Sequence, residues 1–138
     1  SVLECVVGQL DDQMVLKVAD VIRSVMDHET GVVISSDFTH YGHQFGYTPF
    51  TENIKSNIRA LDYGAIDLIR QVDRYGFNTY LNTYKPTICG QYAIKILLEL
   101  LSPSVESGLI KYKCSAEENN DWSHSVSYAT LAFSGGWK

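Results

Sequence analysis

Apolar residues recur with a helical period in the first part of the chain. From residue 12 onward they stand at i, i+3, i+4 and i+7 positions: Val15, Val18, Ala19, Ile22, Val25 and Met26. This spacing predicts an amphipathic helix, and Asp11 is a suitable N-cap for it. Short apolar runs at 3–8 and 32–34 lie on either side of this helix and read as strands. Strand, helix and strand in close succession indicate a βαβ unit with two parallel strands.

The middle of the chain keeps the helical period. An apolar stripe predicts a long helix over residues 54–72, bent at Gly64, with Thr51 as its N-cap. A short helix is expected to follow Gly76, with aromatic residues on one face. A third, more apolar helix is predicted over residues 93–101, between two prolines that bound it.

The last part of the chain changes to strand patterns. Residues 109–114 and 125–133 are predicted strands, and apolar and small side chains alternate in the second of them. The fold class that follows is α/β, with a mixed, largely parallel sheet and flanking helices. No repeat or composition break divides the chain, so residues 1–138 are expected to form a single domain.

Composition excludes several function classes. The net charge is −5 and no Lys/Arg cluster is present, which argues against a nucleic-acid partner. No apolar run reaches the length of about 18 residues that a membrane span needs. The three cysteines are odd in number and widely spaced, so they form neither a disulfide framework nor a zinc knuckle. A reducing, cytoplasmic setting is the expectation.

Polar residues follow the predicted strand at 32–34. Asp37 and His40 stand three residues apart, just after this predicted strand. In open α/β sheets, catalytic and binding groups lie just beyond the carboxyl ends of the strands. A carboxylate beside an imidazole can fix its tautomer and raise its basicity. Ser36 adjoins this pair and His43 follows it, both as weaker candidates. The alternative is a loop aspartate in a turn and a half-buried histidine.

Cys89 lies at or just before the start of the helix predicted over residues 93–101. The unpaired N–H groups of a helix N-terminus favour thiolate, the form needed for metal binding and for nucleophilic attack. The alternative for Cys89 is a small buried apolar residue. Together with His40 and Asp37 it suits either a Cys-dependent hydrolase or a transition-metal site with mixed nitrogen, sulfur and oxygen donors. The residues alone leave both open.

Three motifs carry a family resemblance. Ser-Ser-Asp-Phe-Thr-His-Tyr-Gly at 35–42, Thr-Ile-Cys-Gly at 87–90 and Ser-Val-Ser-Tyr-Ala at 125–129 resemble those of the Memo family (mediator of cell motility), whose prokaryotic members are called AmmeMemoRadiSam system protein B. The helix at 58–65 also fits, and the match runs essentially from residue 6 to residue 133.

The resemblance implies a fold similar to that of the class III extradiol ring-cleaving dioxygenases, with a non-haem metal cleft. It implies that Cys89 joins two histidines as a ligand to iron or copper, and that His40 and Asp37 line the same cleft on its proton-transfer side. Two functions are implied. One is metal-dependent redox activity on an unknown small molecule, and the other is non-catalytic binding of a phosphopeptide or small anion. Whether the chain is an enzyme therefore stays open.

One feature departs from the family pattern. The two histidine ligands belong to the family's N-terminal half, and none of the four histidines here (His28, His40, His43 and His124) matches them. The chain resembles only the C-terminal half, and it is predicted to enter a strand almost at its first residue. We therefore expect a partial chain whose metal site is completed by the missing N-terminal half. The alternatives are that the other half is supplied as a separate chain, or that this protein has lost its metal.

Overall fold

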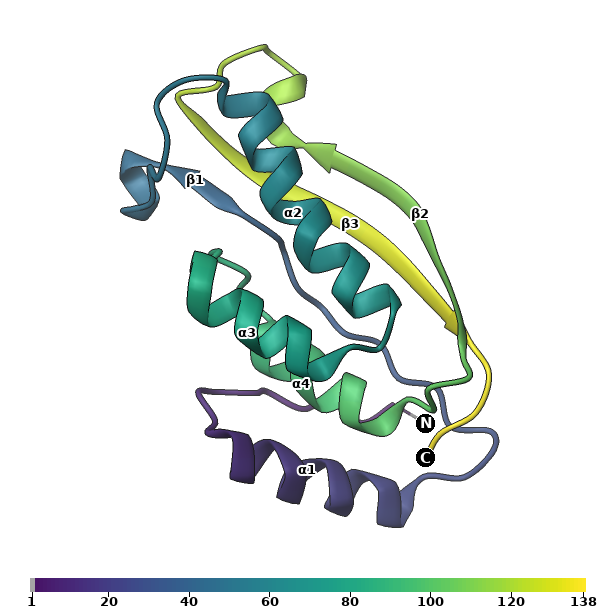
Figure 1. Cartoon of the computed structure of the whole chain (residues 1–138). Helices are drawn as coiled ribbons and strands as arrows, with labels where there is room; N and C mark the ends of the chain where they lie inside the picture. The colour runs from purple at the N-terminus through teal and green to yellow at the C-terminus, as the bar shows by residue number, and fades with distance from the viewer. Residues whose placement is uncertain (1) are drawn as a thin grey trace.

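The computed structural model describes residues 2–138, which form helices packed beside a narrow antiparallel sheet (Figure 1). The elements along the chain are α1 (Asp12–Val25), β1 (His40–Gly42), a 3-10 turn (His43–Phe45), α2 (Ile54–Arg70), α3 (Arg74–Tyr84), α4 (Gln91–Leu100), β2 (Glu106–Cys114), a second 3-10 turn (Ser115–Glu117) and β3 (His124–Ser134). Each of the four predicted helices is present, although α3 begins at Arg74 and not after Gly76 as expected. Within the described residues, none of them has the length and apolar character to cross a bilayer.

Capping explains where the helices begin. The Asp11 carboxylate accepts a hydrogen bond from the Met14 N–H at 2.7 Å, so the predicted N-cap of α1 is confirmed. α3 begins in the same way at Asp73. The N-cap predicted for α2 is wrong, because α2 starts after Asn53 and not at Thr51. Asn53 has a left-handed backbone (φ 50°), which asparagine tolerates better than most residues.

Gly64 has a packing role in the middle of α2, which runs through it as one helix. A Cβ at this position would lie 2.4 Å from the hydroxyl oxygen of Tyr80 on α3. That hydroxyl donates a hydrogen bond to the Leu61 carbonyl at 2.8 Å. The glycine therefore lets α3 approach α2 closely.

The sheet has the order β1-β3-β2, and both pairings are antiparallel. β2 and β3, the two strands predicted at the end of the chain, pair as an antiparallel hairpin with a register irregularity between Leu109 and Lys111. β1 pairs with the start of β3, so that His40 lies opposite Val126. The chain is mixed α/β as expected, but the prediction of a largely parallel sheet is wrong.

The predicted βαβ unit is also wrong, because residues 3–8 and 32–34 form no strands. A strand needs a hydrogen-bonding neighbour, and these segments have none among the described residues. Val33 is 94% exposed and Val6 is fully exposed. Residues 38–42 run beside β3, but residues 31–36 diverge from it and leave a groove of about 620 Å³.

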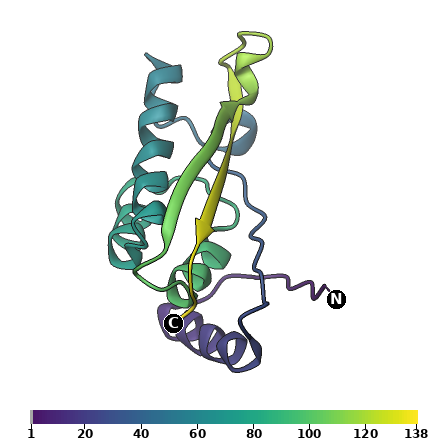
Figure 2. The same ribbon diagram turned by 90° about the vertical axis from the view of Figure 1, so that its right-hand side faces the viewer.

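The main core lies between the sheet and the helices α2, α3 and α4. Figure 2 shows α2 lying along one side of the β2–β3 hairpin. Phe77, Ile66 and Leu98 are fully buried there. Phe38 and Ile88 belong to the same cluster. Because these two side chains are anchored in the core, the chain segments that follow them are held close together.

Candidate functional site

Two segments far apart in the sequence are joined by hydrogen bonds just outside this core. The Asp37 N–H donates to the Cys89 Sγ at 3.1 Å, and the Gly90 N–H donates to the Ser36 Oγ at 2.9 Å. The contact is tight, since a Cβ on Gly90 would lie 2.5 Å from the Ser36 Cβ. The structure thus brings together Ser36, Asp37 and Cys89, three of the residues singled out in the sequence.

His40 is held by two backbone carbonyls. Its Nδ1 lies 3.0 Å from the Phe38 oxygen and 2.9 Å from the Thr87 oxygen. Because a carbonyl oxygen only accepts hydrogen bonds, Nδ1 carries the proton in the neutral ring. The unprotonated nitrogen is then Nε2, which lies 3.7 Å from the Asp37 Oδ2. Asp37 and His40 are neighbours as expected, but the carbonyls orient the ring.

Thr87 was missed in the sequence as a site residue. Its hydroxyl accepts a hydrogen bond from the His40 N–H at 2.7 Å and donates one to the His40 carbonyl at 3.0 Å. This side chain therefore links the backbone at His40 to the segment that carries Cys89. The available signal was its place two residues before Cys89 in the second motif.

Cys89 differs from the other two cysteines in its surroundings. It is exposed immediately before Gly90, the N-cap of α4, and its sulfur accepts a backbone N–H. A helix N-terminus and a hydrogen-bond donor both stabilise negative charge on sulfur. A cysteine within a predicted strand is expected to be a small buried apolar residue. This is confirmed for Cys114, which is buried, and is wrong for Cys5, which is exposed in the irregular segment before α1.

The described residues do not form a complete metal site. Across residues 2–138, no three or more His, Cys, Asp and Glu side chains are grouped so that they could hold a metal ion. His43 begins the exposed turn His43–Phe45 and takes no part in the contacts that join the two segments. Asp37 Oδ2 and His40 Nε2 lie 3.7 Å apart, and Cys89 contacts Asp37 through the Asp37 backbone N–H. Cys89 fits a transition metal chemically, but further ligands are needed.

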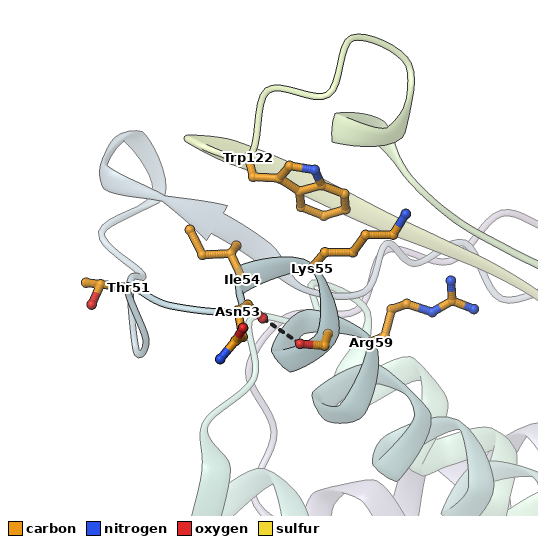
Figure 3. Close-up of a pocket in the computed structure, with 7 residues that line it drawn as sticks. Thr51, Asn53, Ile54, Lys55, Arg59 and Trp122 are labelled. Atoms are coloured by element: carbon orange, nitrogen blue, oxygen red, sulfur yellow. Dashed lines mark hydrogen bonds between the residues drawn. The ribbon is translucent and has the colours of Figure 1, made fainter.

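A second hollow, of about 510 Å³, lies at the start of α2 (Figure 3). Lys55, Arg59 and Trp122 are among the residues that line it. Glu117 already pairs with both cations, at 3.3 Å from Lys55 and 3.9 Å from Arg59. None of the residues lining the hollow belongs to the motifs at 35–42, 87–90 and 125–129, so this hollow is separate from the candidate site.

A sequence model of the family described as "Memo-like protein" matches residues 1–132. The chain belongs to the Memo-like family. It is 35% identical to Protein MEMO1 of Homo sapiens over 109 residues, which are 72% of this chain and 37% of that protein. It is 31% identical to Protein MEMO1 of Xenopus laevis over 142 residues, covering 96% of this chain and 48% of that protein.

A fission-yeast relative extends this similarity. The MEMO1 family protein C4H3.04c of Schizosaccharomyces pombe is 28% identical over 155 residues, covering 94% of this chain and 50% of that protein. The chain thus spans half or less of the length of these curated relatives.

The three Memo-like motifs meet in the structure. Residues 35–42 and 87–90 form the two joined segments of the site. The third motif lies on β3, where Ser127 is fully buried. The Ser127 carbonyl accepts the Phe38 N–H at 2.8 Å, and the Ser127 N–H donates to the Thr39 carbonyl at 3.0 Å. The third motif therefore supports the backbone that leads to His40.

Proposed function

We propose that this chain forms one side of a non-haem metal cleft that holds iron or copper and supports redox chemistry on a small molecule. The observation that carries the proposal is the placement of Cys89 beside Asp37, next to the fixed imidazole of His40. Thiolate is a ligand that redox-active transition metals such as iron and copper accept. The substrate stays undefined in this proposal.

In this proposal each residue has a distinct role. Cys89 is a thiolate ligand, and the Asp37 N–H stabilises the charge on its sulfur. The Nε2 of His40 accepts and returns a proton during turnover, while the Asp37 carboxylate stabilises the imidazolium. Thr87 holds the backbone of His40 in register with Cys89. A metal bound here would supply Lewis-acid and one-electron chemistry.

The remaining ligands are proposed to come from polypeptide outside these 138 residues, namely the N-terminal half of a Memo protein. The relatives are at least twice as long as the region they share with this chain. Exposed apolar side chains at Val6 and Val33, and the groove beside β3, are surfaces that such a segment would cover. A fold related to that of the extradiol dioxygenases and a cytoplasmic location, which suits the free thiols, complete the proposal.

Metal analysis of the complete gene product tests this function. We expect iron or copper to copurify with the wild-type protein and to be lost in Cys89→Ser. Cys5→Ser, at another exposed cysteine, is the matched control and should keep its metal. Unchanged metal content in Cys89→Ser would show that Cys89 is not a ligand.

The same protein separates the competing functions. Stabilisation by a phosphopeptide or a small anion, without bound metal or oxygen consumption, would identify a binding module. Turnover that is abolished by alkylation of Cys89, yet insensitive to a chelator, would identify a Cys-dependent hydrolase.

A further inference from the structure

A carboxylate is completely buried beneath the site. Asp62 lies on α2 and is 0% exposed. Burying such a group is costly unless its oxygens are hydrogen-bonded. Its Oδ1 accepts from the Thr39 N–H at 3.1 Å and from the Thr39 hydroxyl at 2.6 Å. Its Oδ2 accepts from the Tyr112 hydroxyl at 2.6 Å.

Asp62 accepts in all three hydrogen bonds. Burial first, and then the neighbouring carboxylate of Asp62, raise the pKa of the Tyr112 hydroxyl far above its ordinary value. Tyr112 therefore stays protonated and keeps donating to Asp62.

The residue that Asp62 holds lies next to His40. Two of the three hydrogen bonds go to Thr39, whose own carbonyl is held by the Ser127 N–H at 3.0 Å. Phe38 comes directly before Thr39, and its carbonyl is one of the two acceptors for His40 Nδ1. If Thr39 moved, the Phe38–Thr39 peptide would rotate and this carbonyl would turn away from the ring.

We propose that Asp62 is a positioning residue for His40. By holding Thr39 it keeps the Phe38 carbonyl against Nδ1, where this carbonyl acts together with that of Thr87 to favour the Nδ1–H tautomer of neutral His40, with Nε2 free towards Asp37. The inference rests on the proposed role of His40 in proton transfer. A carboxylate that only stabilised the fold would leave the tautomer unchanged.

Nitrogen-15 NMR of the histidine side chains in the purified chain tests this inference, with the His40 signals assigned by their loss in His40→Gln. We expect a single Nδ1–H tautomer in the wild type and a mixture of tautomers in Asp62→Asn. Asp67→Asn, an exposed position on the same helix, should match the wild type. Thr39→Val, which keeps the N–H contact but lacks the hydroxyl, should also give a mixture, and Thr39→Ser should restore the single tautomer.

Two results would overturn the inference. One is a wild-type His40 protonated on Nε2, and the other is a folded Asp62→Asn protein with the wild-type tautomer. If Asp62→Asn did not fold, the comparison of Thr39→Val with Thr39→Ser would decide by the same spectrum. Metal content is a separate readout: a complete protein without metal would refute the proposed function and leave the tautomer result standing.

Discussion

Alanine at Gly90 is expected to separate the two segments that form the site. The added Cβ would lie 2.5 Å from the Ser36 Cβ and 2.7 Å from the Ser36 Oγ. Gly90 has φ −92° and ψ 21°, which other residues can adopt, so the effect is steric and not a matter of backbone conformation. Ser36 must move, and the hydrogen bond that its oxygen accepts from Gly90 is then lost.

The loss of stability is the sum of two costs, the steric clash with Ser36 and the lost hydrogen bond. Overpacking of a close contact costs about 1–3 kcal/mol, and a lost hydrogen bond adds about 1 kcal/mol. We therefore expect Gly90→Ala to lower the free energy of unfolding by about 2–4 kcal/mol. The loss should be measured by urea unfolding, as a lower midpoint with an unchanged slope.

Gly108→Ala is the matched control. A Cβ at Gly108 has nothing within 4 Å, so this substitution should change stability by no more than about 0.5 kcal/mol. If Gly90→Ala unfolded at the same urea concentration as Gly108→Ala, the close approach of the two segments would not exist as described.

Other predictions concern the supports of the site and the core. Thr87→Val removes both hydrogen bonds to the His40 backbone and should lower the free energy of unfolding in urea by about 1–2 kcal/mol. Thr87→Ser, which keeps the hydroxyl, should recover most of this stability. Equal losses in both variants would contradict the role of the Thr87 hydroxyl in holding His40. Phe77 is 0% exposed, so Phe77→Ala should lower the free energy of unfolding by about 3–5 kcal/mol. Tyr75 is 72% exposed, so Tyr75→Ala should lower it by less than about 1 kcal/mol. Similar thermal midpoints for the two variants would contradict the assignment of the core. Burial chiefly raises the pKa of Tyr80 to about 12, so the folded state holds this proton more tightly than the unfolded state. The free energy of unfolding should therefore fall as the pH rises from about 10 towards 12. In Tyr80→Phe, which has no such proton to lose, the fall should be shallower. An identical pH slope in both proteins would refute the raised pKa of Tyr80.

Local signals in the sequence were sufficient for the helices and the hairpin. The helical period of 3.6 and the cap at Asp11 predicted helix bounds that agree with the structure to within a few residues. The alternation of side chains predicted the bounds of β3 equally well. The runs at 3–8 and 32–34 have the same apolar character as buried strands, but a strand also requires a neighbour, which a local pattern does not reveal. β1 was missed because its short sequence shows no alternation and its partner is far along the chain.

The neighbourhood of the site was predictable in part, and the roles of its residues stay predictions. Asp37 and His40 stood out because they follow the run at 32–34, which forms no strand. Cys89 stood out because a helix was expected to begin beside it, and α4 does begin after Gly90. The supporting contacts were not visible, because a threonine or a helical aspartate usually lies at the surface.

Asp62 did carry a signal in the sequence. It stands four residues from Ile58 and from Ile66, on the apolar stripe of its helix. A carboxylate within such a stripe indicates a buried polar contact, even though its partners lie elsewhere in the chain.

X-ray absorption at the iron or copper edge of the complete gene product shows whether the proposed ligand Cys89 is bonded to the metal. We expect a sulfur atom at bonding distance from the metal in the wild type, absent from the spectrum of Cys89→Ser and retained in Cys5→Ser. A metal surrounded only by nitrogen and oxygen atoms in the wild type, or a sulfur signal that persists in Cys89→Ser, would contradict it.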